Sequence, residues 1–115
     1  MIQRGDVPLG TTVNVKFNTR QTSGALATIA GSPVVVAYID NDTTEKTDGI
    51  TLTVDFDGKT GLHNLQVVAS AANGYAAFTD VTLVFLAGTV NGVSLVGEII
   101  ATFSIQNHAG QKAAS

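Results

Sequence analysis

Short segments in which apolar and polar residues alternate recur along this chain of 115 residues, and they constrain its fold more than any other feature. Alternation with a period of two places apolar side chains on one face of a β-strand and polar side chains on the other. In residues 50–56, four apolar side chains alternate with Thr51, Thr53 and Asp55. The chain also has 14 valines, 15 threonines and 7 isoleucines, the β-branched residues that favour strands. The sequence therefore predicts an all-β protein.

Turn signals divide the chain into about seven short strands, spaced at roughly 8–12 residues, which predicts an antiparallel β-sandwich of immunoglobulin-like type. Asn91-Gly92 is the strongest hairpin signal, because both central positions of a type I′ turn need a positive φ. The apolar run 34–39 is expected to be a central strand, buried on both faces, and 75–79 a single helical turn. The other expected strands are 12–18, 25–30, 43–47, 50–56, 61–70, 81–87 and 93–105.

The length fits one domain. We expect residues 10–105 to form the β-sandwich, 1–9 an N-terminal arm outside any strand, and 106–115 a C-terminal tail without apolar periodicity. The inward-facing strand positions are the expected core: Val13, Val15, Phe17, Val35, Ile50, Leu52, Val54, Phe56, Leu83, Phe85, Ile99 and Phe103.

Charge is sparse in this sequence. Charged residues make up 13% of the chain, with a net charge of −3, whereas a soluble surface usually carries about 25–35%. We therefore expect neighbours in an assembly to cover part of the surface; a surface coated with Thr, Ser and Asn is the alternative. Basic residues do not cluster, which argues against nucleic-acid or anionic-membrane binding. No signal-peptide run or stretch of about 20 apolar residues is present, so we expect a chain made in the cytoplasm.

Several short motifs suggest chemistry, but each has a simpler structural explanation. The chain has no cysteine, which excludes disulfides and thiolate chemistry. Gly58-Lys59-Thr60 resembles the end of a phosphate-binding loop, but Thr53 stands where that motif needs glycine, so a hairpin turn is expected. Arg4-Gly5-Asp6 spells an adhesion tripeptide in the expected arm, and Asn41-Asp42-Thr43 is a glycosylation sequon that matters only in a secreted eukaryotic chain.

The acidic residues offer two candidate sites. Hard cations prefer closely spaced carboxylates, and paired carboxylates can perform acid–base work. Turn formation and strand-edge protection explain the same residues without a ligand. The calcium candidates are Asp40, Asp42, Glu45 and Asp48, and the paired carboxylates are Asp55 and Asp57.

The two histidines complete the candidates for catalysis. Catalysis by a Ser-His-Asp arrangement needs a nucleophile within hydrogen-bond reach of an oriented base, which spacing does not show. His63 in a strand and His108 in the tail are expected to be structural or solvent-facing, and Tyr38 to be a core aromatic. The sequence thus predicts no catalytic residue, no metal site and no cofactor.

Other residues carry a resemblance that covers most of positions 10–105. They are Phe17-Asn18-Thr19-Arg20, Ala30-Gly31-Ser32-Pro33, Tyr38-Ile39-Asp40-Asn41, Gly49-Ile50-Thr51-Leu52, Asp55-Phe56-Asp57, Thr60-Gly61-Leu62, residues 87–94, Val96-Gly97 and Phe103-Ser104-Ile105. This pattern resembles small structural proteins encoded among the virion genes of tailed bacteriophages. The resemblance implies an immunoglobulin-like module assembled on the particle, in the tail, at a fibre attachment point or as a capsid decoration, and no active-site residue.

The expected function is therefore that of a non-enzymatic virion structural protein, whose partners are other virion proteins and copies of itself, with no small-molecule substrate. A carbohydrate- or receptor-binding β-sandwich is the alternative, although the chain has no Trp, two Tyr and five Phe for a binding platform. The expected docking element is the arm, with Ile2, Val7 and Leu9 as apolar anchors and Arg4 as a polar contact. Deletion of residues 1–7 is then expected to leave the melting point nearly unchanged.

Overall fold

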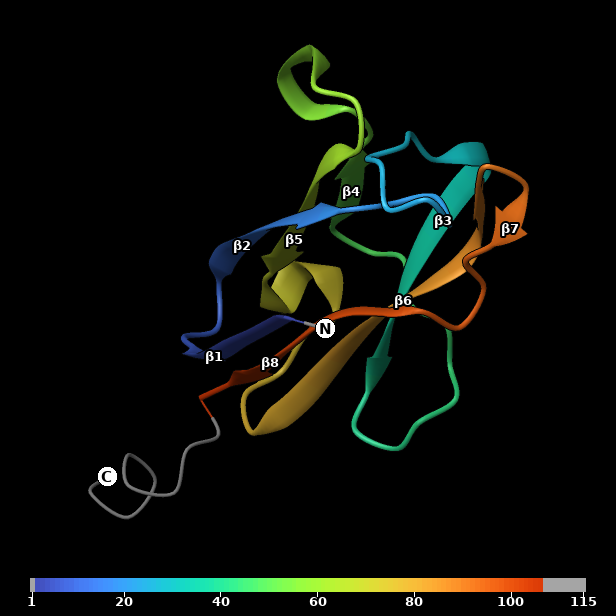
Figure 1. Cartoon of the computed structure of the whole chain (residues 1–115). Helices are drawn as coiled ribbons and strands as arrows, with labels where there is room; N and C mark the ends of the chain where they lie inside the picture. The colour runs from blue at the N-terminus through green and yellow to red at the C-terminus, as the bar shows by residue number, and fades with distance from the viewer. Residues whose placement is uncertain (1, 107–115) are drawn as a thin grey trace.

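Two β-sheets make up the computed structural model, which describes residues 2–106 (Figure 1). The larger sheet has the order β1 (Ile2–Val7), β8 (Ile99–Ile105), β6 (Thr79–Val90) and β3 (Ala30–Ile39), and the short β7 (Val93–Ser94) also pairs with β6. The smaller sheet has the order β2 (Thr11–Asn18), β5 (Leu62–Ala69) and β4 (Ile50–Thr53). Two 3₁₀ turns, η1 (Phe56–Gly58) and η2 (Ala71–Asn73), flank β5. No helix in the described chain is long and apolar enough to span a bilayer. The prediction of an all-β protein is confirmed.

The larger sheet is mixed, so the expectation of a purely antiparallel fold is wrong. β1 runs parallel to β8, with Ile2 opposite Ala101 and Val7 opposite Ile105, and its register shifts near Gly5. Residues 2–7 therefore belong to the sheet and do not form an arm outside it. Their sequence shows no alternation because half of the strand is exposed and the register shift interrupts its period.

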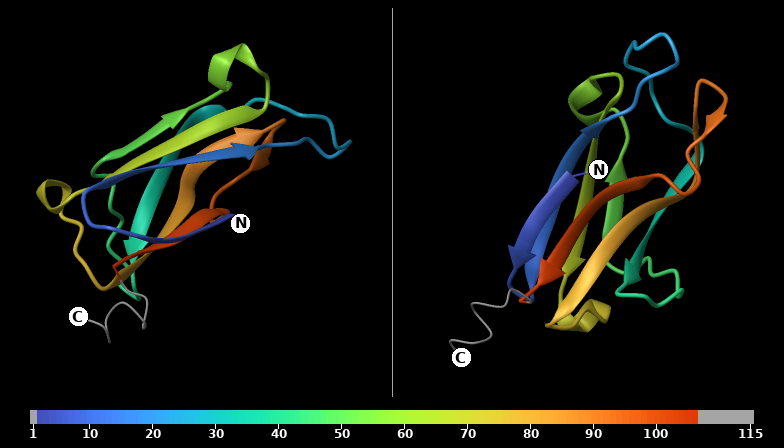
Figure 2. Two further views of the ribbon diagram at one scale, coloured as in Figure 1. Left: turned by 90° about the vertical axis from the view of Figure 1, so that its left-hand side faces the viewer. Right: turned by 60° about the horizontal axis from the view of Figure 1, so that its bottom comes forward.

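The core lies between the two sheets, which Figure 2 shows as two layers. Six expected core residues are buried, namely Val13, Val15, Val35, Leu83, Phe85 and Phe103. Phe17, Ile50, Leu52 and Val54 are partly buried and pack against them.

Phe56 and Ile99, also expected in the core, are exposed. β4 ends at Thr53, and Asp55 adopts a left-handed conformation with φ of 54°, which carries Phe56 into η1 instead of along the strand. In β8 the register shift sets Val84 opposite Ile99 and Leu83 opposite Ala101. The extra residue, Ile100, is buried and Ile99 points outward, because such a bulge reverses the alternation.

β3 is the last strand of its sheet and not the central one that its apolar run predicted. Val35, Val36 and Ala37 are nevertheless buried. Residues 43–47 do not form the expected strand. A single bridge remains, in which Ala37 N–H donates to the Lys46 carbonyl at 2.7 Å and Lys46 N–H donates to the Ala37 carbonyl at 3.0 Å. That bridge covers part of the β3 edge and limits further pairing there.

The hairpin between β6 and β7 forms as predicted, with φ of 49° at Asn91 and 81° at Gly92. The expected long strand 93–105 is interrupted after Ser94, where Glu98 N–H bonds to the Leu95 carbonyl at 2.9 Å in a tight turn. The helical turn expected at 75–79 instead lies at 71–73, and 25–29 contain a single bridge between Arg20 and Leu26 in place of a strand.

Candidate functional site

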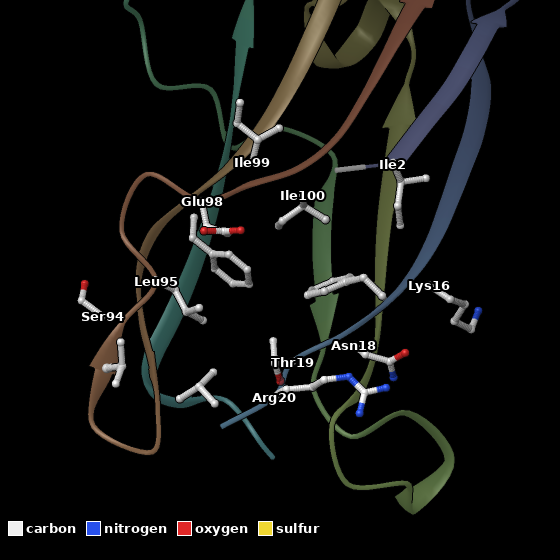
Figure 3. Close-up of a pocket in the computed structure, with 14 residues that line it drawn as sticks. Ile2, Lys16, Asn18, Thr19, Arg20, Ser94, Leu95, Glu98, Ile99 and Ile100 are labelled. Atoms are coloured by element: carbon white, nitrogen blue, oxygen red, sulfur yellow. The ribbon is translucent and has the colours of Figure 1, made fainter. Parts of the chain in front are cut away.

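A cleft of about 580 Å³ opens between the two sheets where β2 ends and β8 begins (Figure 3). The rings of Phe17 and Phe85 line it and meet edge to face, with 5.9 Å between their centroids. Leu95, from the β7–β8 connection, and Ile100, from β8, add apolar surface. Its volume lies in the range of small-molecule sites, about 300–1,000 Å³.

Charged side chains stand on both walls of the cleft. Figure 3 places Lys16 and Arg20 on one side and Glu98 on the other. Both cations bind the chain itself: Lys16 Nζ donates to Asn64 Oδ1 at 2.9 Å, and Arg20 Nη1 donates to the Gly24 carbonyl at 2.9 Å. No buried side-chain polar atom of residues 2–106 lacks a hydrogen-bond partner. The cleft can accept an apolar group, but it presents no unsatisfied buried polar group that would select a ligand.

His63 lies directly behind the wall of this cleft and is fully buried. Its ring packs against Phe17, with 5.2 Å between centroids, and its Nε2 lies 2.7 Å from Thr19 Oγ1. Its Nδ1 accepts a hydrogen bond from Asp55 N–H at 3.1 Å. The Thr19 hydroxyl in turn donates to the Ala27 carbonyl. One imidazole thus connects the end of β2 with the turn that follows β4.

These partners assign the proton of the neutral ring to Nε2, because Nδ1 is already an acceptor. Burial lowers the pKa of His63 from its ordinary value of 6.5, and the Asp55 carboxylate has a smaller effect in the opposite direction. Hydrogen bonds from Thr28 and from Gly61 N–H lower the pKa of the Asp55 carboxyl. The imidazole is therefore held neutral and the carboxylate ionised at neutral pH.

Threonine, histidine and aspartate come together here, but their hydrogen bonds run against catalysis. A general base must accept the proton of its nucleophile, whereas Nε2 donates to Thr19. The Thr19 hydroxyl is buried, and its proton is bound to the Ala27 carbonyl. The arrangement agrees with a structural role for His63. His108 lies outside the described residues.

The candidate calcium ligands serve turns instead. Asp42 Oδ1 accepts from Thr44 N–H at 2.9 Å, which lowers the pKa of Asp42, and Asp40 Oδ1 accepts from Asp80 N–H at 2.9 Å. Asp48 pairs with Lys46 at 2.9 Å. Within residues 2–106, no three His, Cys, Asp or Glu side chains gather closely enough to hold a metal ion.

The remaining motifs also have structural places. Gly58-Lys59-Thr60 forms the turn before β5, with no helix after it, as expected. Arg4-Gly5-Asp6 lies in β1, so its expected place in an arm outside any strand is wrong, and Asp6 Oδ1 accepts from Ser104 Oγ at 2.7 Å. Asp57 pairs loosely with Lys59 on the surface at 3.5 Å.

Tyr75, which the sequence analysis missed, is the buried tyrosine, whereas Tyr38 is only partly buried. Tyr75 Oη donates to the Asp48 carbonyl at 2.8 Å. Burial, with a smaller contribution from Asp48, raises the pKa of Tyr75 to about 12.

Most of the expected docking residues pack into or against the chain's own core. Val7 is buried in the core, and Ile2 and Leu9 are partly buried and pack against the core. Leu9 N–H donates to Gln106 Oε1 at 2.8 Å, which fastens the end of β1 to the end of β8. Of the four residues, only Arg4 is exposed. The expected tail beyond Gln106 lies outside the described residues.

A second surface feature lies on the outward face of β3, β6 and β8. Val36, Val84 and Ile99 stand side by side in one row across these strands. Leu86 and Val34 follow on the same face, and Val96 in the adjoining turn is 62% exposed. We call the four exposed members, Val34, Leu86, Val96 and Ile99, the outer patch; they are between 37% and 62% exposed. The signal for it was the presence of apolar residues on both faces of β3 and β6 in the sequence.

Comparison with known proteins gives no relative: no family model matches the sequence, and no curated protein or solved structure matches it.

Proposed function

We propose that this chain is a non-enzymatic structural protein of a tailed-bacteriophage virion, an immunoglobulin-like module that assembles on the particle in the tail, at a fibre attachment or on the capsid. The outer patch is the observation that carries the proposal. The sequence resemblance to virion structural proteins supports the phage context.

The strand order supports an immunoglobulin-like fold. In immunoglobulin constant domains, strands B, E and D share one sheet and strands C, F and G the other. Assigning β2, β3, β4, β5, β6 and β8 to B, C, D, E, F and G reproduces both groups. The first strand differs, because β1 lies beside β8 and not beside β2.

The outer patch supports assembly because its apolar side chains are exposed to water in the isolated chain. Contiguous exposed apolar surface on a soluble protein marks interaction sites. Its four members and the two valines of its floor, Val36 and Val84, carry no charge or hydrogen-bonding side chain. In a two-fold dimer the same patch of both subunits meets at the interface, so the proposal takes a second copy of this chain as the partner.

Sedimentation velocity over a range of concentrations tests the patch. We expect the wild-type chain to self-associate and the variant Leu86→Lys/Ile99→Lys to remain monomeric, because each lysine would have to be desolvated at the contact. Thr82→Lys/Thr102→Lys is the matched control, since these two threonines pair at the polar end of the same face. A wild-type chain that stays monomeric at all concentrations contradicts self-association.

Incorporation into particles tests the virion role. We expect purified virions to contain the wild-type chain and the threonine control at equal copy number, measured by quantitative mass spectrometry, and little of the patch variant. Virions that never contain the chain would overturn the proposal.

A carbohydrate-binding role, the alternative, would use the smaller sheet. Its outer face carries amides, including Asn64, which donates to Asn14 Oδ1 at 3.3 Å, and Phe56 is exposed at its end. Lys16 Nζ lies 4.3 Å from the centre of the Phe56 ring, where a sugar would stack. Because Lys16 already covers the Phe56 ring, the carbohydrate-binding alternative ranks second. A glycan array probed with the Lys16→Ala variant measures whether uncovering Phe56 creates carbohydrate binding.

A further inference from the structure

We propose that His63 is an acid-sensitive latch, which at neutral pH fastens the segment 19–28 to the turn 54–61 and thereby shapes one wall of the cleft. This inference concerns a conformational device and does not depend on the proposed virion role.

The latch joins segments that are distant in sequence. Its hydrogen bonds run from Asp55 N–H to Nδ1, from Nε2–H to the Thr19 hydroxyl and from that hydroxyl to the Ala27 carbonyl. The two segments touch closely around it. A Cβ atom added at Gly61 would lie 2.9 Å from both Ala27 N and Leu26 Cβ, and Thr19 N–H donates to the Gly61 carbonyl at 3.1 Å. The imidazole is the one titratable ring within this junction among the described residues.

Protonation is incompatible with this arrangement. An imidazolium carries a proton on both nitrogens, so Nδ1–H would face Asp55 N–H, two donors only 3.1 Å apart. The buried ring also has no water to solvate the charge. To accept the proton, the turn must move away from the ring, which gives Nδ1–H access to water or to the Asp55 carboxylate.

Proton linkage determines how the stability of the closed junction changes with pH. Burial lowers the pKa of His63 below its ordinary 6.5 in the closed state, whereas the open state titrates near that ordinary value. The open state therefore binds more protons below about pH 6.5, and the closed junction loses stability as the pH falls through this range. Above it, both states hold neutral imidazole and the latch keeps its full strength.

The charged groups around the ring do not reverse this loss of stability at low pH. Asp55, in the turn after β4, favours the imidazolium but less than burial disfavours it. On β2, Lys16 binds Asn64 on the outer face and Arg20 binds the Gly24 carbonyl. Near this junction, η1 carries Asp57 and Lys59, which pair on its exposed surface, and Glu98 lies on the far wall of the cleft.

Opening the latch would alter the cleft because two of its wall residues hold the ring. Phe17 packs against the His63 ring and Thr19 is hydrogen-bonded to it, and both residues line the cleft. Acid therefore loosens the β2 wall while the opposite wall, formed by the β7–β8 connection, keeps its bonds to β6.

Nuclear magnetic resonance of the full chain tests the latch. A His108→Gln background leaves His63 as the single histidine. At pH 7.5 we expect ring ¹⁵N shifts of the Nε2–H tautomer. Between pH 7 and 5 we expect the amide protection factors of residues 19–28 and 54–61 to fall at least tenfold, while those of β6 stay constant. His63→Gln is the matched control, because its amide can donate to Thr19 and accept from Asp55 N–H without titrating; its protection factors should not change.

Two results would overturn the latch. One is an equal pH response of both segments in the chain that keeps His63 and in the His63→Gln variant, which would assign the response to other groups. The other is a His63 ring that titrates at its ordinary value while the amides of both segments stay unchanged. The second measurement uses only the chain that keeps His63, so it decides the question even where the glutamine variant does not fold.

Discussion

The two sheets share one core but present opposite outer faces. On the smaller sheet, the outward residues Asn14, Lys16 and Asn64 form a hydrogen-bonded row of polar groups. On the larger sheet, Val36, Val84 and Ile99 occupy the equivalent row. Antiparallel sheets commonly have one face on the core and one in water, and the smaller sheet follows this rule. The larger sheet has two apolar faces: the core covers the inner one, while on the outer one Val36 and Val84 are buried and Ile99 is exposed.

The largest effect should come from removing the edge of the larger sheet. Deletion of residues 1–7 removes β1, its ladder with β8, the bond from Ser104 to Asp6 and the buried side chain of Val7. We expect the melting temperature to fall by about 10 °C or more, or cooperative unfolding to be lost. A thermal melt followed by circular dichroism measures this. An unchanged melting point would restore the view of these residues as a dispensable arm.

Asymmetry between the two outer faces is tested next. Val84→Asp sets a carboxylate between Val36 and Ile99, with 9% of residue 84 exposed, and should lower the free energy of unfolding by about 3 kcal/mol. Gln66→Asp makes the matched change on the smaller sheet, where residue 66 is half-buried between Asn14 and Thr51, and should cost about 0.5 kcal/mol. Urea titrations measure both. Equal losses would mean that the faces do not differ in environment.

Alternation made much of the core predictable but not its exceptions. In β5, alternation places Leu65, Val67 and Ala69 on one side, and the same parity places His63 with them, so its burial could have been deduced. Its partners could not, because Thr19 is 44 residues away and Asp55 contributes its backbone N–H from a left-handed turn.

The edge strand β1 and the bulge in β8 could likewise not be predicted from the sequence. A bulge at Ile100 sends Ile99 outward although both residues are isoleucine, and nothing in their order marks which one faces the core. β1 pairs because β8 offers a free edge, which depends on the whole sheet and not on residues 2–7. The outer patch was signalled only indirectly, by sparse charge and by apolar residues at successive positions in β3.

A smaller effect should appear at Tyr75, in the loop between η2 and β6. Its hydroxyl binds the Asp48 carbonyl just before β4, and its pKa is raised to about 12. In the unfolded chain tyrosine ionises near pH 10, so this contribution to stability is complete below pH 10 and is lost as the pH rises towards 12. Tyr75→Phe should cost about 1 kcal/mol at pH 7 and flatten the alkaline decline. Urea titrations between pH 7 and 11 measure it, and a decline as steep in the variant would assign the effect to other groups.

The smallest effect should come from the polar row itself. Lys16→Met keeps an unbranched side chain over Phe56 but removes the hydrogen bond to Asn64 and the cation over the ring. Because Lys16 is exposed, water replaces much of what is lost, and we expect the free energy of unfolding to fall by no more than about 0.5 kcal/mol. The same substitution adds an apolar group to the smaller sheet, so sedimentation should still find no new self-association, since one methionine among amides does not make a continuous patch. A loss above about 2 kcal/mol would show that the polar row is a buried network, and the two outer faces would then differ in chemistry but not in exposure to water.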